Sequence, residues 1–370
     1  RVSRGRGDVY KRQLVELVKL ANLIITVTKA IACGNRVQSV LEVQNSMELA
    51  DVEQKIETDK NAPAVVFDHV CLTYAGAGSE SLTDISFTAK HGETIGIIGG
   101  TGSGKSSVVN LIPRFYDVTK GRVLVDGVDV KDYSPEVLRS RIGIVPQKAV
   151  LFAGTIVENL RWGKKDASKE EMWKALEISQ SKEFVEKKDG QLESRIEQGG
   201  KNLSGGQRQR IGIARALATN PRFIVCDEAV SALDVSIQAQ VINMFEELQE
   251  KLGVAYLFIA HDLLVVHHIS DRIAVMYLGR IVEIADSNEL NDNPMHPYTQ
   301  SLLSAVPYPD PKMAKERQRI VLEGDVPSPL HMPSGCAFRT RCRYATEKCA
   351  QECPSLTDRG NGHQVACWNK

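Results

Sequence analysis

The sequence lacks an excess of charge of either sign, a long hydrophobic run and an internal repeat. Its 370 residues include 46 basic and 46 acidic side chains, so the formal net charge is +0 and no overall field attracts nucleic acid. The longest apolar stretch, 14–31, is interrupted by charged side chains, whereas a membrane span needs about 20 mostly apolar residues. No compact apolar run leads to a small-residue cleavage site, which argues against a secretory signal. We therefore expect any role at a membrane to depend on a partner that crosses it.

The first residues do not have the pattern of a folded segment. The chain begins with Arg1, and residues 3–13 show no hydrophobic period. Residues 8–13 match a translated transposon-adapter sequence used in DNA library preparation; a basic disordered tail is the alternative. We therefore treat residues 1–13 as adapter-derived and exclude them from the fold prediction.

A glycine-rich segment carries the clearest chemistry. Residues 99–106 read Gly-Gly-Thr-Gly-Ser-Gly-Lys-Ser, the GxxxxGK[ST] pattern of a phosphate-binding loop. Backbone without side chains can wrap the negative oxygens of a triphosphate, so that its N–H groups point at phosphate. Lys105 would place a positive charge against the outer phosphates, and Ser106 would offer a hydroxyl to Mg²⁺. A plain glycine-rich turn would not explain this Lys-Ser pair, so the segment predicts a nucleoside triphosphate site.

Two carboxylates follow the apolar segment 223–226. Asp227 would stand at the end of a buried strand as a Mg²⁺ partner, and Glu228 could polarise the attacking water. Asp-Glu pairs are common on protein surfaces, so the pair alone is weak evidence for a catalytic site. Its position after a strand, in a chain with a phosphate loop, favours the catalytic interpretation.

Three further side chains are ambiguous on their own. His261 follows the apolar run 256–260 and Gln147 follows 142–146, so each stands at a predicted strand end. A lone histidine is more often a structural residue, and a lone glutamine is an ordinary loop amide. Tyr74 either stacks on adenine or is a strand aromatic of a small sheet.

The hydrophobic pattern predicts an α/β protein. Apolar residues at helical spacing predict one helix over 14–49, followed by a polar linker over 51–62. Prolines and cysteines dominate from residue 291, which predicts a separate terminal module. Between them we expect strands at 65–68, 84–88, 94–98, 222–226 and 254–260, β-rich closing segments over 272–283, a helix over 105–112 and a mainly helical segment over 147–217.

Residues 203–207 read Leu-Ser-Gly-Gly-Gln, and with this second motif the chain resembles ABC-type ATPases over about residues 63–290. The resemblance implies a P-loop NTPase (RecA-like) core, a small antiparallel β-subdomain, a helical subdomain with the signature motif, and a Cys-rich C-terminal extension. It implies a head-to-tail sandwich of two such domains around two Mg-ATP. It also implies transmembrane permease subunits as partners, a peripheral location at the cytoplasmic face of the cell membrane, and no nucleic acid partner.

The same resemblance assigns roles to individual residues. Glu228 would be the general base, His261 would hold the γ-phosphate, and Gln147 would link catalysis to the membrane partner. Tyr74 would stack on the base, the signature segment would contact the γ-phosphate bound to the second subunit, and residues 231–234 would follow the dimer interface. The expected nucleotide ligands are Tyr74, Gly99, Gly100, Thr101, Gly102, Ser103, Gly104, Lys105, Ser106, Ser107, Ser204, Gly205, Gly206, Gln207 and Asp234, and the expected Mg²⁺ ligands are Ser106, Gln147 and Asp227.

The first half of the chain resembles one transporter subfamily. Residues 14–201 look like a multidrug or lipid ABC exporter, in which the final transmembrane helix runs into the ATPase. Two motifs are typical of that subfamily: Leu-Phe-Ala-Gly-Thr-Ile at 151–156 and Asn-Leu-Arg-Trp-Gly at 159–163. The segment 14–62 would then be the helix and linker at the end of an exporter transmembrane domain, with the nucleotide-binding domain over 63–290.

The second half resembles another subfamily. From about residue 211 the chain looks like the ATPase of an oligopeptide/dipeptide importer, and Asn-Pro-Met-His-Pro-Tyr-Thr at 293–299 opens that subfamily's extension over 291–370. We therefore expect a chimera with a seam between about Lys201 and Arg222, by misassembly or as a real hybrid gene. We expect the chain to be the ATP-hydrolysing subunit of an ABC transporter, with oligopeptide/dipeptide transport as the leading assignment.

Three alternatives are weighed against this assignment. The first is the ATPase half of a multidrug or lipid exporter. The second is a soluble ABC-type ATPase acting on ribosomes or DNA; such proteins usually carry two ATPase domains or a coiled-coil insertion, which this chain does not show. The third is an inactive binding module, which would lack the equivalent of Lys105 or Glu228.

Five of the eight cysteines crowd the C-terminal extension. In a reducing compartment, clustered thiols more often hold metal than form disulfides. Four thiolates are enough for a [4Fe–4S] cluster or a Zn²⁺ site, and reduced free thiols are the alternative. The family resemblance favours iron. The expected ligands are Cys336, Cys342, Cys349 and Cys367, with Cys353 as a substitute.

Overall fold

The computed structural model describes residues 2–43, 47, 59, 61–231, 233–306, 319–328 and 332–370, and only the backbone of residues 2–8. It consists of two units, residues 1–48 and 49–370, which are described separately. Most of the predicted linker over 51–62 lies outside the described residues.

In the first unit, the described residues form one helix, α1 (Val2–Leu41), and a short end after it. The helix expected over 14–49 is present, but it begins earlier, inside the segment excluded from the prediction, and it ends at Leu41. Its apolar side chains at helical spacing, such as Leu17 and Ile24, are exposed. Within the described part of the chain, no helix combines the length and the apolar character that crossing a membrane requires.

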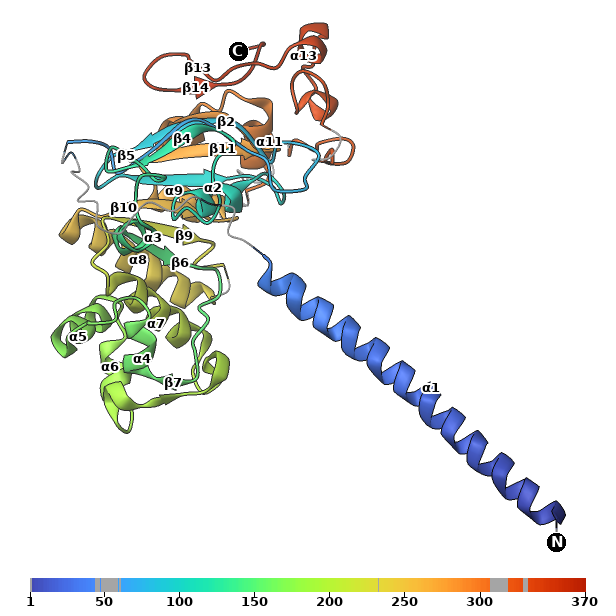
Figure 1. Ribbon diagram of the computed structural model, residues 1–370. Helices are drawn as coiled ribbons and strands as arrows, with labels where there is room; N and C mark the ends of the chain where they lie inside the picture. Colours follow the sequence, from blue (N-terminus) through green and yellow to red (C-terminus); the bar gives the residue numbers. More distant parts are fainter. Residues whose placement is uncertain are drawn as a thin grey trace. The chain divides into compact units, whose positions relative to one another are not determined.

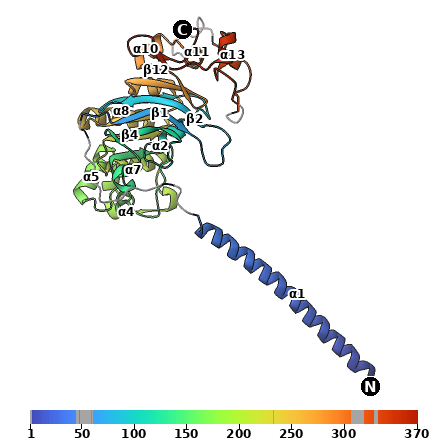
Figure 2. The same cartoon turned by 45° about the horizontal axis from the view of Figure 1, so that its top comes forward.

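The second unit is built on an eight-stranded sheet (Figures 1 and 2). The strands β11, β3, β10, β9 and β6 are parallel, and β12, β14 and β13 are added antiparallel at one edge. In spatial order the strands are β13 (Thr357–Asp358), β14 (Gln364–Val365), β12 (Arg280–Asp286), β11 (Arg272–Tyr277), β3 (Thr94–Ile98), β10 (Ala255–Ile259), β9 (Phe223–Asp227) and β6 (Ile142–Val145).

Both faces of this sheet are covered, which explains the continuous apolar runs of its central strands. In β10, Tyr256 and Phe258 join the core cluster that contains α7 (Gly205–Leu217) and α8 (Val235–Leu252). Their neighbours Leu257 and Ile259 join the opposite cluster, which contains α2 (Lys105–Leu111) and the small sheet. The strands predicted at 94–98, 222–226 and 254–260 correspond to β3, β9 and β10, and their ends are correct to within one or two residues.

A four-stranded antiparallel sheet forms the expected β-subdomain, with the order β2 (Leu82–Ala89), β1 (Val65–Leu72), β4 (Lys120–Val125) and β5 (Val128–Asp129). The first two strands extend beyond the predicted 65–68 and 84–88. Strand β1 continues through His69, which has φ 49°, and its register with β2 shifts on either side of Val70. A β-bulge of this kind interrupts the pairing of two strands locally and lets it resume beyond. The alternation of apolar and polar residues alone did not predict that β1 continues past the bulge.

The middle segment is helical, as expected. It contains α4 (Ile156–Arg161), α5 (Lys169–Ile178), α6 (Lys182–Glu186) and α7, together with the short strands β7 (Gly154–Thr155) and β8 (Arg195–Ile196). In both views α4 to α7 lie at one end of the second unit and the C-terminal extension at the other (Figures 1 and 2). The other helices among the described residues are α3 (Pro135–Arg141), α9 (Leu263–Ile269), α10 (Ser287–Asp292), α11 (Pro297–Ser304) and α13 (Glu347–Gln351), with 3₁₀ turns at Gln191–Glu193, Gln198–Gly200 and Arg339–Arg341.

The C-terminal extension is joined to the main sheet through a buried carboxylate. Glu283 on β12 is fully buried, and it accepts hydrogen bonds from the backbone N–H groups of Met295 (2.6 Å) and His296 (3.0 Å). His363, beside β14, donates from Nε2 to Glu283 Oε1 at 2.8 Å. Its other ring nitrogen lies 3.5 Å from Glu289 on α10. One carboxylate therefore ties together the sheet, the start of α11 and the C-terminal hairpin.

We expect Glu283→Ala to lower the free energy of unfolding by about 3–5 kcal/mol, because it leaves buried partners without their acceptor. Urea denaturation measures this change. The matched control is Glu247→Ala on α8, where an exposed carboxylate pairs with Lys251 four residues later and contributes about 0.5 kcal/mol at most. Equal losses in the two variants would contradict the anchoring role.

Candidate functional site

Four adjacent parallel strands bring the predicted catalytic residues to one edge of the sheet. The phosphate loop follows β3, His261 follows β10, Asp227 ends β9 and Gln147 follows β6. These strands are neighbours in the order β3-β10-β9-β6, so their carboxyl ends meet. In open α/β sheets this edge is where ligands bind.

The phosphate loop has the backbone that its glycines were expected to provide. Gly102 and Gly104 have φ of 77° and 99°, a region that other residues enter at a cost. Lys105 begins α2, and its Nζ donates to the carbonyl oxygens of Gly99 (2.8 Å) and Gly100 (3.1 Å). Burial lowers the pKa of Lys105, and the negative charges of Glu228 and Asp227 oppose that shift.

Glu228 is held on both carboxylate oxygens. Gln147 Nε2 donates to Oε2 at 2.8 Å, and His261 Nε2 lies 2.5 Å from Oε1. The backbone of Glu228 is left-handed, with φ 53°, which is uncommon for a residue with a long side chain. Strain of this kind clusters at functional sites. Burial, followed by the charge of Glu228, raises the pKa of the adjacent Asp227.

A cavity of about 330 Å³ lies over these groups. Tyr74 lines it from just beyond the end of β1, donating from Oη to Ser107 Oγ at 2.9 Å and packing edge-on against Tyr116. It is therefore not a residue within a strand, and its position is compatible with stacking on a base. The cavity is lined by Tyr74, Ser81, Thr101, Gly102, Ser103, Gly104, Lys105, Ser106, Ser107, Glu228 and His261.

The signature residues do not line this cavity. Ser204 caps α7, accepting from Gln207 N (3.2 Å), while the Gln207 side chain accepts from Ser204 N (3.1 Å). Asp234 caps α8 with its side chain alone, accepting from Ile237 N at 3.0 Å. Both caps are exposed. Two helix N-termini, which favour anions, are therefore exposed and do not line the cavity over the phosphate loop.

The donor set at the sheet edge suits Mg²⁺. Ser106 offers an exposed hydroxyl at the start of α2, and Asp227 and Gln147 offer a carboxylate and an amide from the two neighbouring strand ends. Oxygen donors of this kind, completed by substrate phosphates and water, are what Mg²⁺ takes in nucleotide sites. The ion would neutralise charge on the β- and γ-phosphates there.

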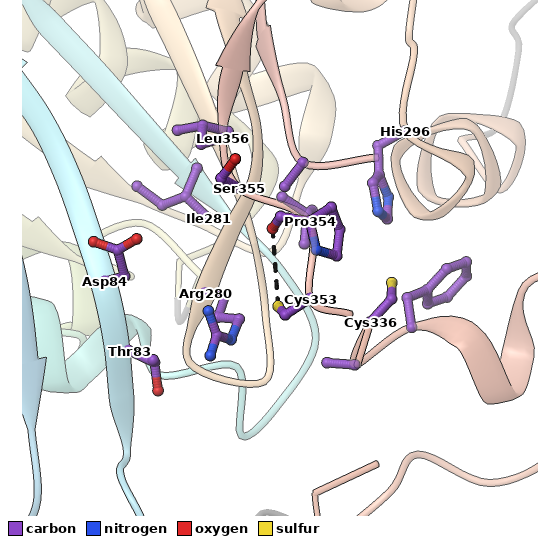
Figure 3. Close-up of a pocket in the computed structure, with 14 residues that line it drawn as sticks. Thr83, Asp84, Arg280, Ile281, His296, Cys336, Cys353, Pro354, Ser355 and Leu356 are labelled. Atoms are coloured by element: carbon purple, nitrogen blue, oxygen red, sulfur yellow. Dashed lines mark hydrogen bonds between the residues drawn. The ribbon is translucent and has the colours of Figure 1, made fainter. Parts of the chain in front are cut away.

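The cysteines of the extension do not make a metal site in the described conformation. Among the described residues, no group of three or more His, Cys, Asp or Glu side chains is placed to hold a metal ion. Cys336 and Cys353 line a cavity of about 140 Å³ beside β2 and β12 (Figure 3). Cys353 directs its sulfur at the Pro354 carbonyl oxygen, 3.8 Å away, and not at Cys336 (Figure 3). Of the expected ligands, Cys336 and the substitute Cys353 thus line one cavity without forming a ligand set.

One contact to the phosphate loop was missed at the sequence level. The backbone N–H of Gly100 donates to Oη of Tyr298 on α11, 2.9 Å away. Tyr298 lies in the segment 293–299, which was used only as a mark of family resemblance. No local pattern signals a contact between residues 198 positions apart.

Two family models match the chain: "ABC transporter" over residues 82–231, and "Oligopeptide/dipeptide transporter, C-terminal region" over residues 282–349. The Oligopeptide transport ATP-binding protein AppF of Bacillus subtilis (strain 168) is 45% identical over 294 residues, covering 78% of this chain and 89% of the relative. The chain belongs to the ATP-binding proteins of ABC transporters. The Oligopeptide transport ATP-binding protein OppF of Haemophilus influenzae is 42% identical, over 78% of this chain and 88% of the relative.

A solved structure supports the same fold. The structure of a bacterial Atm1-family ABC exporter with ATP bound matches 77% of this chain with a TM-score of 0.66 and 30% identity. The chain spans about half (49%) of the length of that exporter chain. The predicted α/β P-loop fold is therefore confirmed.

Membership of this family confirms two further predictions. The chain is an ATPase of the ABC type, and ATP with Mg²⁺ is the expected substrate complex. The expected seam receives no support from the comparisons. The match to the B. subtilis relative covers 294 residues, more than lie on either side of the segment between Lys201 and Arg222, so it runs across that segment.

Proposed function

We propose that this ABC ATPase drives peptide import. The observation that carries the ATPase part is the meeting of Lys105, Glu228, Gln147 and His261 at one sheet edge. The peptide part rests on relatives named for oligopeptide transport and on the matching C-terminal region. In domain terms, residues 63–290 would form the nucleotide-binding domain and 291–370 the importer-type extension.

In the proposed reaction, Glu228 accepts a proton from the water that attacks the γ-phosphate in line. Its two oxygens are oriented by Gln147 and His261, which leaves the carboxylate little rotational freedom. His261 would also donate to the γ-phosphate, and Lys105 would turn from its loop carbonyls to the outer phosphates. Tyr74 would stack on the base.

A second ATPase subunit would complete the site. The cavity of one chain contains no signature residue, while the capped N-termini of α7 and α8 are exposed. A head-to-tail partner would bring Ser204, Gly205 and Gly206 to the γ-phosphate from the opposite side. Asp234 would then lie along the dimer interface.

Permease subunits would dock on a groove whose lining comes from both sides of Gln147 in the sequence. This groove has a volume of about 690 Å³, and its lining includes Phe115, Phe152 and Trp162, whose side chains are 43%, 46% and 68% exposed. Exposed aromatic clusters of this kind mark protein-interaction sites. Docking there would hold the chain peripherally at the cytoplasmic face of the membrane.

We expect Glu228→Gln to slow ATP hydrolysis by about 10²–10⁴-fold while nucleotide binding is kept, because glutamine preserves the size of the side chain but cannot accept the proton. Phosphate release at saturating ATP and the ADP dissociation constant separate the two effects. Lys105→Ala should instead weaken ADP binding, and Glu247→Gln, an exposed substitution, should change neither. Turnover at the wild-type rate in Glu228→Gln would rule out this residue as the base.

A second candidate function keeps the exporter resemblance of residues 14–201. On this proposal the docking groove fits the membrane domain of an exporter. The C-terminal extension resembles that of importer subunits, whose permeases would not fit this groove. Its basis is the exporter-like sequence at 151–156 and 159–163, whereas the match to the exporter structure covers 77% of this chain and is not confined to residues 14–201. The hybrid would bind ATP, hydrolyse it at a basal rate and couple to no transporter.

Complementation distinguishes these candidates. We expect the chain to restore uptake of a labelled tripeptide in a bacterium that lacks the matching ATP-binding subunit of an oligopeptide importer, and Glu228→Gln to abolish the rescue. Absence of rescue together with basal ATPase activity of the purified chain would favour the hybrid. Long reads of genomic DNA across the codons for 201–222 would then show two genes instead of one.

A metal site in the extension is proposed as well, with iron favoured over zinc. Burial, together with the nearby Cys349, Cys353 and Cys342, raises the pKa of Cys336 to about 11, so these thiols lie close enough to affect one another. Metal binding would displace their protons and require the segment to rearrange, since the described conformation holds no ligand set.

We expect chain purified without oxygen to be brown and to contain iron, and Cys367→Ser to lose the metal. Elemental analysis measures the content. Cys33→Ser is the matched control, because Cys33 is an exposed thiol on α1. Colourless chain with stoichiometric zinc would identify the other metal, and chain free of both would contradict the site.

A further inference from the structure

Tyr298 reaches the phosphate loop from the C-terminal extension. Its hydroxyl accepts the Gly100 N–H at 2.9 Å, and the side chain is 4% exposed. A Cβ atom added to Gly100 would lie 3.4 Å from this hydroxyl, so the tyrosine rests directly on the loop. We propose that Tyr298 is a positioning residue for the phosphate loop, through which the extension sets the affinity for nucleotide.

The start of α11 fixes the backbone of Tyr298. His296 caps the helix, its Nδ1 accepting from Tyr298 N at 3.1 Å, and Pro297 occupies the first helical turn. Burial lowers the pKa of His296 to about 3, so the ring stays neutral and Nδ1 stays available as an acceptor. The N–H of His296 is itself held by Glu283. The backbone of Tyr298 is therefore fixed by a helix cap that is itself anchored to the main sheet.

Aromatic packing fixes the ring of Tyr298. Its centroid lies 4.7 Å from that of Tyr277 on β11 and 5.5 Å from that of Phe338. The rings of Tyr277 and Phe338 meet edge to face at 5.2 Å. Tilted and edge-on contacts at these separations are favourable beyond the area that they bury. The hydroxyl is thus presented to the loop by a three-ring cluster with little freedom to move.

Phe338 connects this cluster to the cysteine-bearing segment. It is 1% exposed and stands between Cys336 and Cys342 in the sequence. Cys336 N donates to the carbonyl oxygen of Cys349 at 2.8 Å, which ties the loop before Phe338 to α13. A change in the packing of the cysteine segment is therefore transmitted to Phe338, then to Tyr298, and through its hydroxyl to Gly100.

The functional consequence is a preorganised loop. Removing the hydroxyl leaves the Gly100 N–H without its acceptor, and the loop must be ordered by the nucleotide itself. That cost falls on binding and not on the chemical step, because the described hydrogen bonds and ring contacts of Tyr298 do not involve the residues around Glu228. The inference rests on the proposed nucleotide site and concerns how that site is held.

We expect Tyr298→Phe to weaken Mg-ADP binding about tenfold and to raise KM for ATP by the same factor, with kcat unchanged at saturating ATP. Calorimetry gives the ADP dissociation constant, and phosphate release gives the kinetic constants. Amide hydrogen exchange of a peptide containing Gly100 should accelerate in the variant. Tyr344→Phe is the matched control, because Tyr344 lies in the same extension, is 49% exposed and lines a cavity that includes no residue of the phosphate loop.

Phe338→Leu tests transmission from the cysteine segment. It keeps the Tyr298 hydroxyl and removes the ring packing around it. ADP binding should therefore also weaken, by a smaller factor than in Tyr298→Phe. Unchanged ADP affinity and Gly100 exchange in Tyr298→Phe would overturn the proposal, and an effect of Tyr298→Phe without one of Phe338→Leu would overturn its link to the cysteines. Wild-type chain that binds no ADP would instead refute the nucleotide site, so the two failures are distinguishable.

Discussion

The hydrogen-bonded order of four parallel strands is the constraint on which the site depends. Strands β3, β10, β9 and β6 are contiguous, and each delivers one functional group at its carboxyl end. Their interiors are apolar on both faces, so a slip of one residue would exchange the two sets of core contacts. The same packing that stabilises the sheet therefore fixes the spacing between the phosphate loop, Asp227, His261 and Gln147.

The sequence predicted this part of the molecule well, for a physical reason. A phosphate loop needs glycine at positions of positive φ followed by Lys-Ser, and a buried strand that ends in a carboxylate is readable locally. Lys105, Asp227 and Glu228 therefore stand where the motifs placed them. Two features of Glu228 could not be predicted from the sequence. One is its left-handed backbone, and the other is the contact of Gln147 and His261 with its two carboxylate oxygens. Both depend on neighbouring strands that are distant in sequence.

The extension was harder to predict. Its composition suggested a terminal module, and in the structure its hairpin joins the main sheet and Glu283 anchors it. Neither the burial of a lone glutamate nor the reach of Tyr298 to Gly100 leaves a periodic signal. The cysteines differ, since their spacing suggested a ligand set that their side chains do not form in the described conformation. Spacing constrains which thiols can meet, whereas packing decides which do.

The C-terminal hairpin also closes an exposed sheet edge. Strand β12 is buried along nearly its whole length, and β14 pairs with it at Glu283 and Ile284. Without that cover, β12 would present an apolar edge with unpaired backbone groups, which is a template for pairing with other chains. The last residues of the chain thus protect the ATPase core from self-association, so loss of the hairpin would show first as poor solubility and only afterwards as lost activity.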